Sequence, residues 1–174
     1  AQDDFVVTEL HIPKGKKIQF KMRSQDVLHS AYMPYFRAQM NCVPGMVTEF
    51  SFTPIYTSSE YRELPYMVEK VANINALRSK KSIELVAKGQ TALDPYTFDY
   101  LLLCNKICGA SHYNMQMKVV VDTPEDYKKW LSEQVSLVDE IKTAAAPAPV
   151  DGAPATTDST KTNDTAAVVK IAMK

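Results

Sequence analysis

Residues 96–123, YTFDYLLLCNKICGASHYNMQMKVVVDT, decide the fold. The first part, YTFDYLLLC (96–104), is apolar and rich in residues that favour strands, and MQMKVVVDT (115–123) alternates between apolar and polar side chains. Both patterns are typical of β-strands. Between them lies a short loop that contains Gly109, and four side chains able to bind metal lie on this loop and at its two ends. This segment therefore predicts a pair of strands joined by a loop that could bind metal.

Further strands are predicted in the first third of the chain. Three runs alternate between apolar and polar residues, namely FVVTELHIP (5–13), KKIQFKMRS (16–24) and VTEFSFTP (47–54). The side chains expected to face inward are Ile18, Phe20, Met22, Phe50 and Phe52. Turn residues separate the runs, with PKG after the first and Pro-Gly before the third. These strands predict a mostly-β fold, a small sandwich.

Changes in composition divide the chain into segments. Residues 55–93 are charged and favour helix, so they predict a mainly helical insertion between the sandwich segments 1–54 and 94–122. Thr-Pro-Glu-Asp at 123–126 has the cap, the proline and the acidic first turn of a helix, which we expect over 123–142. Residues 143–174 are rich in Ala, Pro and Thr and predict a flexible, disordered tail.

The overall composition excludes several classes of protein. Lys and Arg total 20, and so do Asp and Glu, so the chain has no basic excess for nucleic acid. No apolar run is long enough for a transmembrane helix. Three cysteines are too few for a disulfide scaffold, and the odd count predicts at least one free thiol.

The loop residues form a spaced set of metal-binding side chains, Cys104-x3-Cys108-x3-His112-x2-Met115. Sulfur ligands together with an imidazole select copper among biological metals, and methionine is a poor ligand for zinc. Any one of the four would usually be an ordinary core or surface residue. Four together on one loop favour a copper site over an accidental cluster.

Of the other side chains that could bind metal or pass electrons, only His29 is a further candidate for the metal site. His29 lies in the loop DVLHSAYMP and is expected at the same end of the sandwich as the cysteine loop. The sequence around His11 contains no pattern that suggests a metal site, so His11 is interpreted as structural. Cys42, beside Pro44-Gly45, is interpreted as a small buried residue. Trp130, in the predicted C-terminal helix, is interpreted as a packing residue.

These motifs resemble a known family. DVLHS at 26–30, VPG at 43–45 and CxxxCGxxHxxM at 104–115 are similar to the copper A domain of cytochrome c oxidase subunit II from bacterial haem-copper oxidases. The resemblance covers residues 5–53 and 94–140 and implies a cupredoxin-like Greek-key β-sandwich. It also implies a binuclear copper A centre of two copper ions, both bridged by Cys104 and Cys108. One copper would also bind His29 and Met115, and the other His112 and the backbone carbonyl of Lys106.

The resemblance further implies a role in respiration. Electrons would come from cytochrome c, or from a fused or associated c-type cytochrome, and pass to haem in subunit I, where oxygen is reduced. The domain is expected at the periplasmic face of the bacterial inner membrane, and its membrane anchor on a segment not present in this chain. The insertion at 55–93 would cap the domain or dock another subunit.

Three positions depart from the family pattern. Asn41 stands where an acidic residue is common, Met46 where arginine is common, and Lys106 where glutamate is common. The carbonyl of Lys106 remains available for copper, but its side chain cannot bind a cation. Magnesium or manganese at the boundary with subunit I is therefore doubtful, and our hypothesis is that the Lys106 ammonium replaces that ion.

Alternative functions have weaker support. A copper chaperone or thiol-redox protein can also carry Cys-x3-Cys, but such proteins need βαβ alternation around the cysteines, which this sequence lacks. Nitrous oxide reductase carries the same copper centre but needs a long upstream domain. A quinol oxidase subunit II lacks the copper ligands that are present here.

Overall fold

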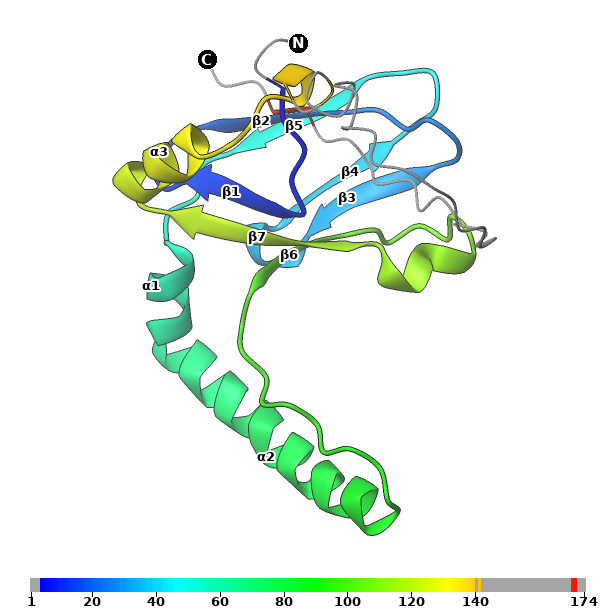
Figure 1. Cartoon of the computed structure of the whole chain (residues 1–174), viewed down its shortest axis with the longest axis vertical. Coiled ribbons are helices and arrows are strands. Elements are labelled where there is room, and N and C mark those ends of the chain that lie inside the picture. The colour runs from blue at the N-terminus through cyan, green and yellow to red at the C-terminus, as the bar shows by residue number, and fades with distance from the viewer. Residues whose placement is uncertain (1–3, 140, 142–169, 172–174) are drawn as a thin grey trace, which may run out of the picture.

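Two β-sheets form the body of the protein in a computed structural model, which describes residues 4–139, 141 and 170–171. The larger sheet has the strand order β1-β7-β6-β3-β4 and the smaller sheet the order β5-β2-β8 (Figure 1). The strands are β1 (Glu9–Pro13), β2 (Ile18–Met22), β3 (His29–Met33), β4 (Ala38–Cys42), β5 (Thr48–Phe52), β6 (Tyr100–Leu103), β7 (Gln116–Asp122) and β8 (Lys170–Ile171). β1 pairs with β7 in parallel, and the other pairs are antiparallel.

The hydrophobic core lies between the two sheets. Ile18, Phe20 and Met22 are buried on one face of β2, as the alternation predicts. Phe20 stacks on Phe50 and Phe52 of β5, so the small sheet turns its aromatic face inward. The opposing layer is supplied by the large sheet with Leu10, Ile12, Ala31, Met33, Tyr100, Val119 and Val121. The predicted mostly-β sandwich is thus confirmed.

The predicted helical insertion is also confirmed. It contains α1 (Ser58–Glu63) and α2 (Pro65–Ala87). Thr57 and Glu60 form a reciprocal capping box at the start of α1, and Pro65 occupies the first turn of α2. Gly89 follows the end of α2 with a positive φ of 74°, as expected for a helix-terminating glycine.

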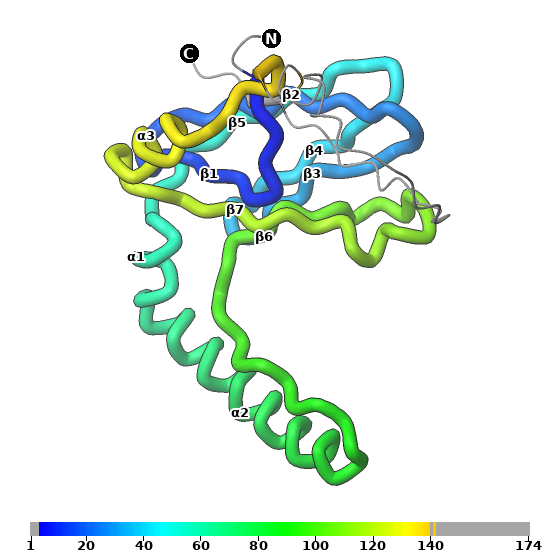
Figure 2. The backbone as a smooth tube through the Cα atoms, viewed as in Figure 1, coloured from blue at the N-terminus to red at the C-terminus, as the bar shows by residue number. Residues whose placement is uncertain are grey.

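The two helices project from the sandwich, and the chain returns beside α2 to reach β6 (Figure 2). We call residues 58–95 the arm. Met67 is fully buried and anchors the base of the arm in the core. Farther out, the Asn75 side chain bonds both the N–H and the carbonyl of Tyr96, which holds the returning segment on α2.

The helix after β7 is shorter than predicted. The predicted helix over 123–142 is observed as α3 (Pro124–Ser132), and the chain turns at Glu133 before residues 137–139 become helical again. The Gln134 side chain donates to the carbonyl of Trp130, and the Ser136 hydroxyl accepts from the Asp139 N–H, which starts a new turn of helix. Of the predicted tail, residues 143–174, only Lys170–Ile171 lie within the described part, where they pair with β2 as β8.

Candidate metal centre

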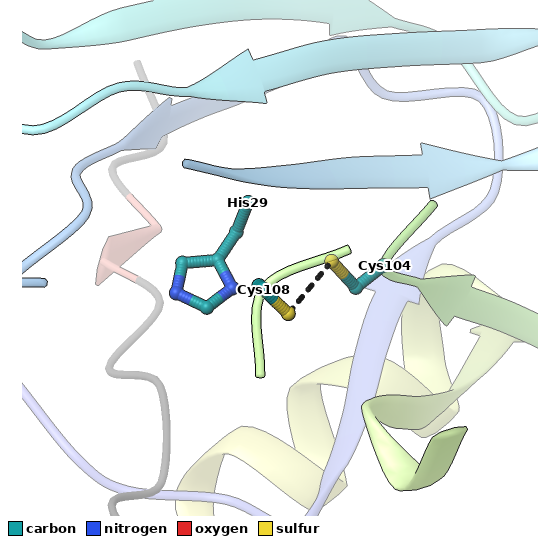
Figure 3. A group of neighbouring side chains, drawn as sticks. All are labelled: His29, Cys104 and Cys108. Atoms are coloured by element: carbon teal, nitrogen blue, oxygen red, sulfur yellow. Dashed lines mark hydrogen bonds between the residues drawn. The ribbon is translucent and has the colours of Figure 1, made fainter. Parts of the chain in front are cut away.

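Three donor side chains converge at one end of the sandwich. His29 was predicted in a loop but is the first residue of β3, so that prediction was wrong. Cys104 directly follows β6, and Cys108 lies on the loop from β6 to β7. A ring nitrogen of His29 and the two cysteine sulfurs all lie within 4.8 Å of one another, and all three residues are partly buried. The sulfurs are 3.7 Å apart and the His29 ring turns one nitrogen toward them (Figure 3). The spacing suits a shared metal site.

The loop is held in shape by its own backbone. The Cys104 N–H donates to the Met115 carbonyl at 3.1 Å and so closes the base of the loop. Inside it, η2 (Ala110–Asn114) turns the chain so that His112 comes back toward Cys108. Gly109, just before η2, has φ 145° and ψ −174°, a region that only glycine adopts readily. The glycine after Cys108 is therefore required by the backbone.

The remaining predicted donors lie around the two sulfurs. His112 Nδ1 is 3.5 Å from Cys108 Sγ, and Met115 Sδ is 3.1 Å from the same sulfur. The Lys106 carbonyl oxygen is 3.4 Å from Cys104 Sγ. The structure thus brings all six predicted donors together, two of them from the cysteines, two from histidines, one thioether and one carbonyl. Metal binding by this set remains a prediction.

His29 is oriented by a neighbouring carboxylate. Asp26 Oδ1 accepts a hydrogen bond from His29 Nε2 at 2.8 Å. His29 Nδ1 is buried and has no hydrogen-bond partner among the described residues. A buried ring nitrogen without a partner is costly unless it has a ligand. The orphaned nitrogen beside two thiols therefore fits a metal ion.

The electrostatics of the cluster distinguish the two cysteines. Burial opposes ionisation of Cys104, but backbone hydrogen bonds from Lys106 and Ser30 and the contact with His29 outweigh it and lower its pKa to about 6. Burial and the neighbouring Cys104 raise the pKa of Cys108. Burial opposes protonation of His29, but Asp26 and Cys104 outweigh it and raise its pKa. One thiolate thus forms readily, and a cation would favour the second.

The residues interpreted as structural lie outside the donor set. Cys42 faces His29 across the β3–β4 ladder and packs against the core, where burial raises its pKa. His11 bonds Asp122 through Nδ1 at 2.5 Å and stacks on Trp130 with ring centroids 4.5 Å apart. Trp130 packs against Phe5 and Tyr127 as well. These contacts agree with a packing role for all three residues.

Sequence reasoning missed the residues that support the donors. Asp26 is the first residue of the motif DVLHS, and its place three residues before His29 could have identified it as the partner of that histidine. Ser30 and Asn105 also escaped notice, although Ser30 Oγ donates to Asn105 Oδ1 at 2.6 Å. Asn41 Oδ1 is buried without a hydrogen-bond partner among the described residues, and Met46 is exposed.

Comparison with known proteins identifies the relatives of this chain. No protein-family model matches the sequence. The chain is 37% identical over 136 residues to the alternative cytochrome c oxidase subunit 2 of Bradyrhizobium diazoefficiens, an alignment that covers 77% of this chain and 35% of that protein. The chain is a homologue of bacterial cytochrome c oxidase subunit II. It is also 28% identical over 123 residues to cytochrome c oxidase subunit 2 of Thermostichus vulcanus, covering 70% of this chain and 25% of that protein.

This subunit II homologue therefore spans about a third or less of the length of these relatives. Among solved structures, the periplasmic domain of cytochrome oxidase subunit II (CoxB) from Bradyrhizobium japonicum aligns with a TM-score of 0.46 and 18% identity, covering 76% of this chain and 70% of that chain. None of the described helices is long and apolar enough to cross a membrane.

Proposed function

We propose that this subunit II homologue holds a binuclear copper A centre and accepts electrons from cytochrome c, or from a fused or associated c-type cytochrome, for transfer to haem in subunit I. The observation that carries the proposal is the pair of cysteine sulfurs 3.7 Å apart, surrounded by two imidazoles, a thioether and a carbonyl oxygen. Soft donors of this kind favour copper. The homology to subunit II supports the same assignment.

The donors divide between two copper ions in this proposal. Cys104 and Cys108 would hold both ions, His29 and Met115 would complete the site of one copper, and His112 with the Lys106 carbonyl would complete the site of the other. When bound, the copper pair would supply one-electron transfer chemistry. The protein's part is to hold the donors on a closed loop, so that little rearrangement accompanies the change of charge. Oxygen reduction belongs to subunit I, so this chain is an enzyme only as part of the oxidase.

The surface around the centre supports a protein partner at this end. Ile107 is 96% exposed and Tyr113 is 89% exposed, and each directly neighbours a donor residue. Val27, Leu28, Met46 and Val47 are also exposed and belong to the loops at the same end. Clustered exposed apolar side chains mark interaction sites. We propose that this apolar rim faces subunit I, with the domain at the periplasmic face of the inner membrane.

Two positions beside the rim lack the acidic side chain that would bind a divalent cation. Lys106 is partly buried beside the cysteines, and Asn41 offers an amide where a carboxylate would bind a divalent ion. We therefore expect no magnesium or manganese at the boundary with subunit I, with the ammonium of Lys106 in its place. Stoichiometric magnesium or manganese beside Lys106 in the assembled oxidase would contradict this.

A dithiol redox or copper-chaperone function is the second candidate. The lowered pKa of Cys104 and the 3.7 Å spacing of the two sulfurs are features that thiol exchange also uses. That function does not require His112 or Met115, which lie against Cys108. The two functions therefore differ in what these two side chains contribute.

Copper loading of the chain tests the proposal. We expect two coppers per chain and an EPR hyperfine pattern from one unpaired electron shared by both nuclei. Cys108→Ala should lose the shared pattern, whereas Cys42→Ser, a matched cysteine variant outside the donor set, should retain it. One copper with a mononuclear signal would reject the binuclear centre, and unchanged copper binding by His112→Ala and Met115→Leu would favour the dithiol function.

A further inference from the structure

Ser30 and Asn105 form a reciprocal hydrogen-bonded pair beside the metal centre. Ser30 Oγ donates to Asn105 Oδ1 at 2.6 Å, and the Asn105 N–H donates to Ser30 Oγ at 2.8 Å. Ser30 is 6% exposed, so the pair is protected from water on the Ser30 side. Gln39 Nε2 makes a longer contact of 3.4 Å to the same Asn105 oxygen. We call the Ser30–Asn105 pair the clamp.

The clamp stands where backbone pairing stops. β3 and β6 pair in antiparallel register at Tyr32 and Leu103. Moving two residues outward along each antiparallel strand from that pair leads to Ser30 and Asn105. At this rung the serine hydroxyl, rather than a strand carbonyl, accepts the Asn105 N–H. The loop backbone is thus released from strand geometry while remaining attached to β3.

Both residues of the clamp adjoin donors of the metal centre. Ser30 directly follows His29, and Asn105 lies between Cys104 and Lys106. The clamp is therefore a direct link between the strand that carries His29 and the loop that carries the sulfurs.

We propose that Ser30 and Asn105 are positioning residues, which set the placement of His29 relative to Cys104 and thereby the geometry of the copper centre. This inference rests on the proposed function. Removing the hydroxyl leaves the Asn105 N–H and Oδ1 without their partner, which favours a rearrangement of the loop. Supporting residues of this kind commonly change metal affinity by about 10–100-fold.

The test compares Ser30→Ala with Ser30→Thr, which keeps the hydroxyl, and with Ser51→Ala, an exposed serine on β5. In the metal-free chain we expect Ser30→Ala to speed amide hydrogen exchange in residues 104–115. In the copper-loaded chain we expect it to lower copper affinity by about tenfold or more, to alter the EPR hyperfine pattern and to shift the reduction potential. Ser30→Thr should restore these properties, and Ser51→Ala should not change them.

A second variant keeps the inference testable if Ser30→Ala does not fold. Asn105→Ala retains the backbone N–H but removes Oδ1, so it should give a smaller change in the same direction. Unchanged exchange, affinity and spectra in both variants would overturn the inference while leaving the copper centre intact. A wild-type chain that forms no binuclear centre would instead overturn the proposed function and, with it, any role of the clamp in copper geometry.

Discussion

Asp26 Oδ1 lies 2.8 Å from Nε2 of His29, and the Nδ1 atom of the same ring is buried without a partner among the described residues. The carboxylate therefore fixes which nitrogen carries the proton and leaves the other as a lone-pair donor. Contact with His29 is the main reason that the pKa of Asp26 is lowered. The two residues form a carboxylate–histidine pair at the edge of the metal centre.

Replacing Asp26 with asparagine should weaken copper binding. An amide can present its NH₂ group to Nε2, which would shift the ring proton to Nδ1 and oppose metal binding there. We expect an affinity loss of about tenfold, at the lower end for such supporting residues, because Asp26 is largely exposed. Competition titration with a copper chelator measures it, with Glu69→Gln on α2 as the control. Equal affinities for both variants would contradict the prediction.

The three cysteines should differ in reactivity in the metal-free chain. The pKa of Cys104 is lowered to about 6, so its thiolate predominates at neutral pH, whereas the pKa values of Cys42 and Cys108 are raised. Iodoacetamide should therefore modify Cys104 first near neutral pH, and the rate should fall as the pH is lowered through the pKa of Cys104. Peptide mass mapping over time identifies the site. Faster labelling of Cys42 or Cys108 would show the assignment of the thiolate to be wrong.

Copper should stabilise the folded chain, because the donors converge only when the sandwich is formed. For each copper ion that binds, a free copper concentration about 100 times its Kd should add about 2.7 kcal/mol to the free energy of unfolding. Thermal unfolding with and without copper measures it, and chelation should reverse the gain. In Cys108→Ala the gain should shrink strongly. A similar gain in that variant would point to copper bound elsewhere.

The base of the arm should matter more for stability than its surface. Met67 is 1% exposed and Leu77 is 67% exposed, although both lie on α2. Met67→Ala should cost about 2–5 kcal/mol, because it leaves a cavity in the core. Leu77→Ala should change stability by about 0.5 kcal/mol or less. Urea denaturation compares the two, and similar losses would mean that the arm does not pack as described.

Much of the fold was predictable because each pattern was local. The alternation at Ile18, Phe20 and Met22 gave one buried face of β2, and the capping residues Thr123 and Pro124 placed the start of α3 correctly. The end of α3 was not predictable in this way. Helical periodicity continues past Ser132, but the side chains of Gln134 and Ser136 bond the backbone and interrupt the helix.

The candidate site was predictable to the extent that its donors share one loop. Cys104, Cys108, His112 and Met115 are close in sequence, and their spacing was the signal. His29 required the expectation that loops gather at one end of a sandwich, together with the family resemblance. The clamp left no such signal, because Ser30 and Asn105 are 75 residues apart and ordinary polar residues by type. Only the strand register brings them together.

The position of the clamp also affects how the chain can vary in length. The whole arm lies between Ser30 and Asn105, so these residues close a loop of the chain that contains both helices. The entropy of closing a flexible loop grows only with the logarithm of its length, about 0.6 kcal/mol for each doubling. The outer turns of α2, beyond the anchor at Met67, can therefore lengthen or shorten at little entropic cost while the ends of the loop stay fixed. Changes in the length of the arm should then leave the donors in place.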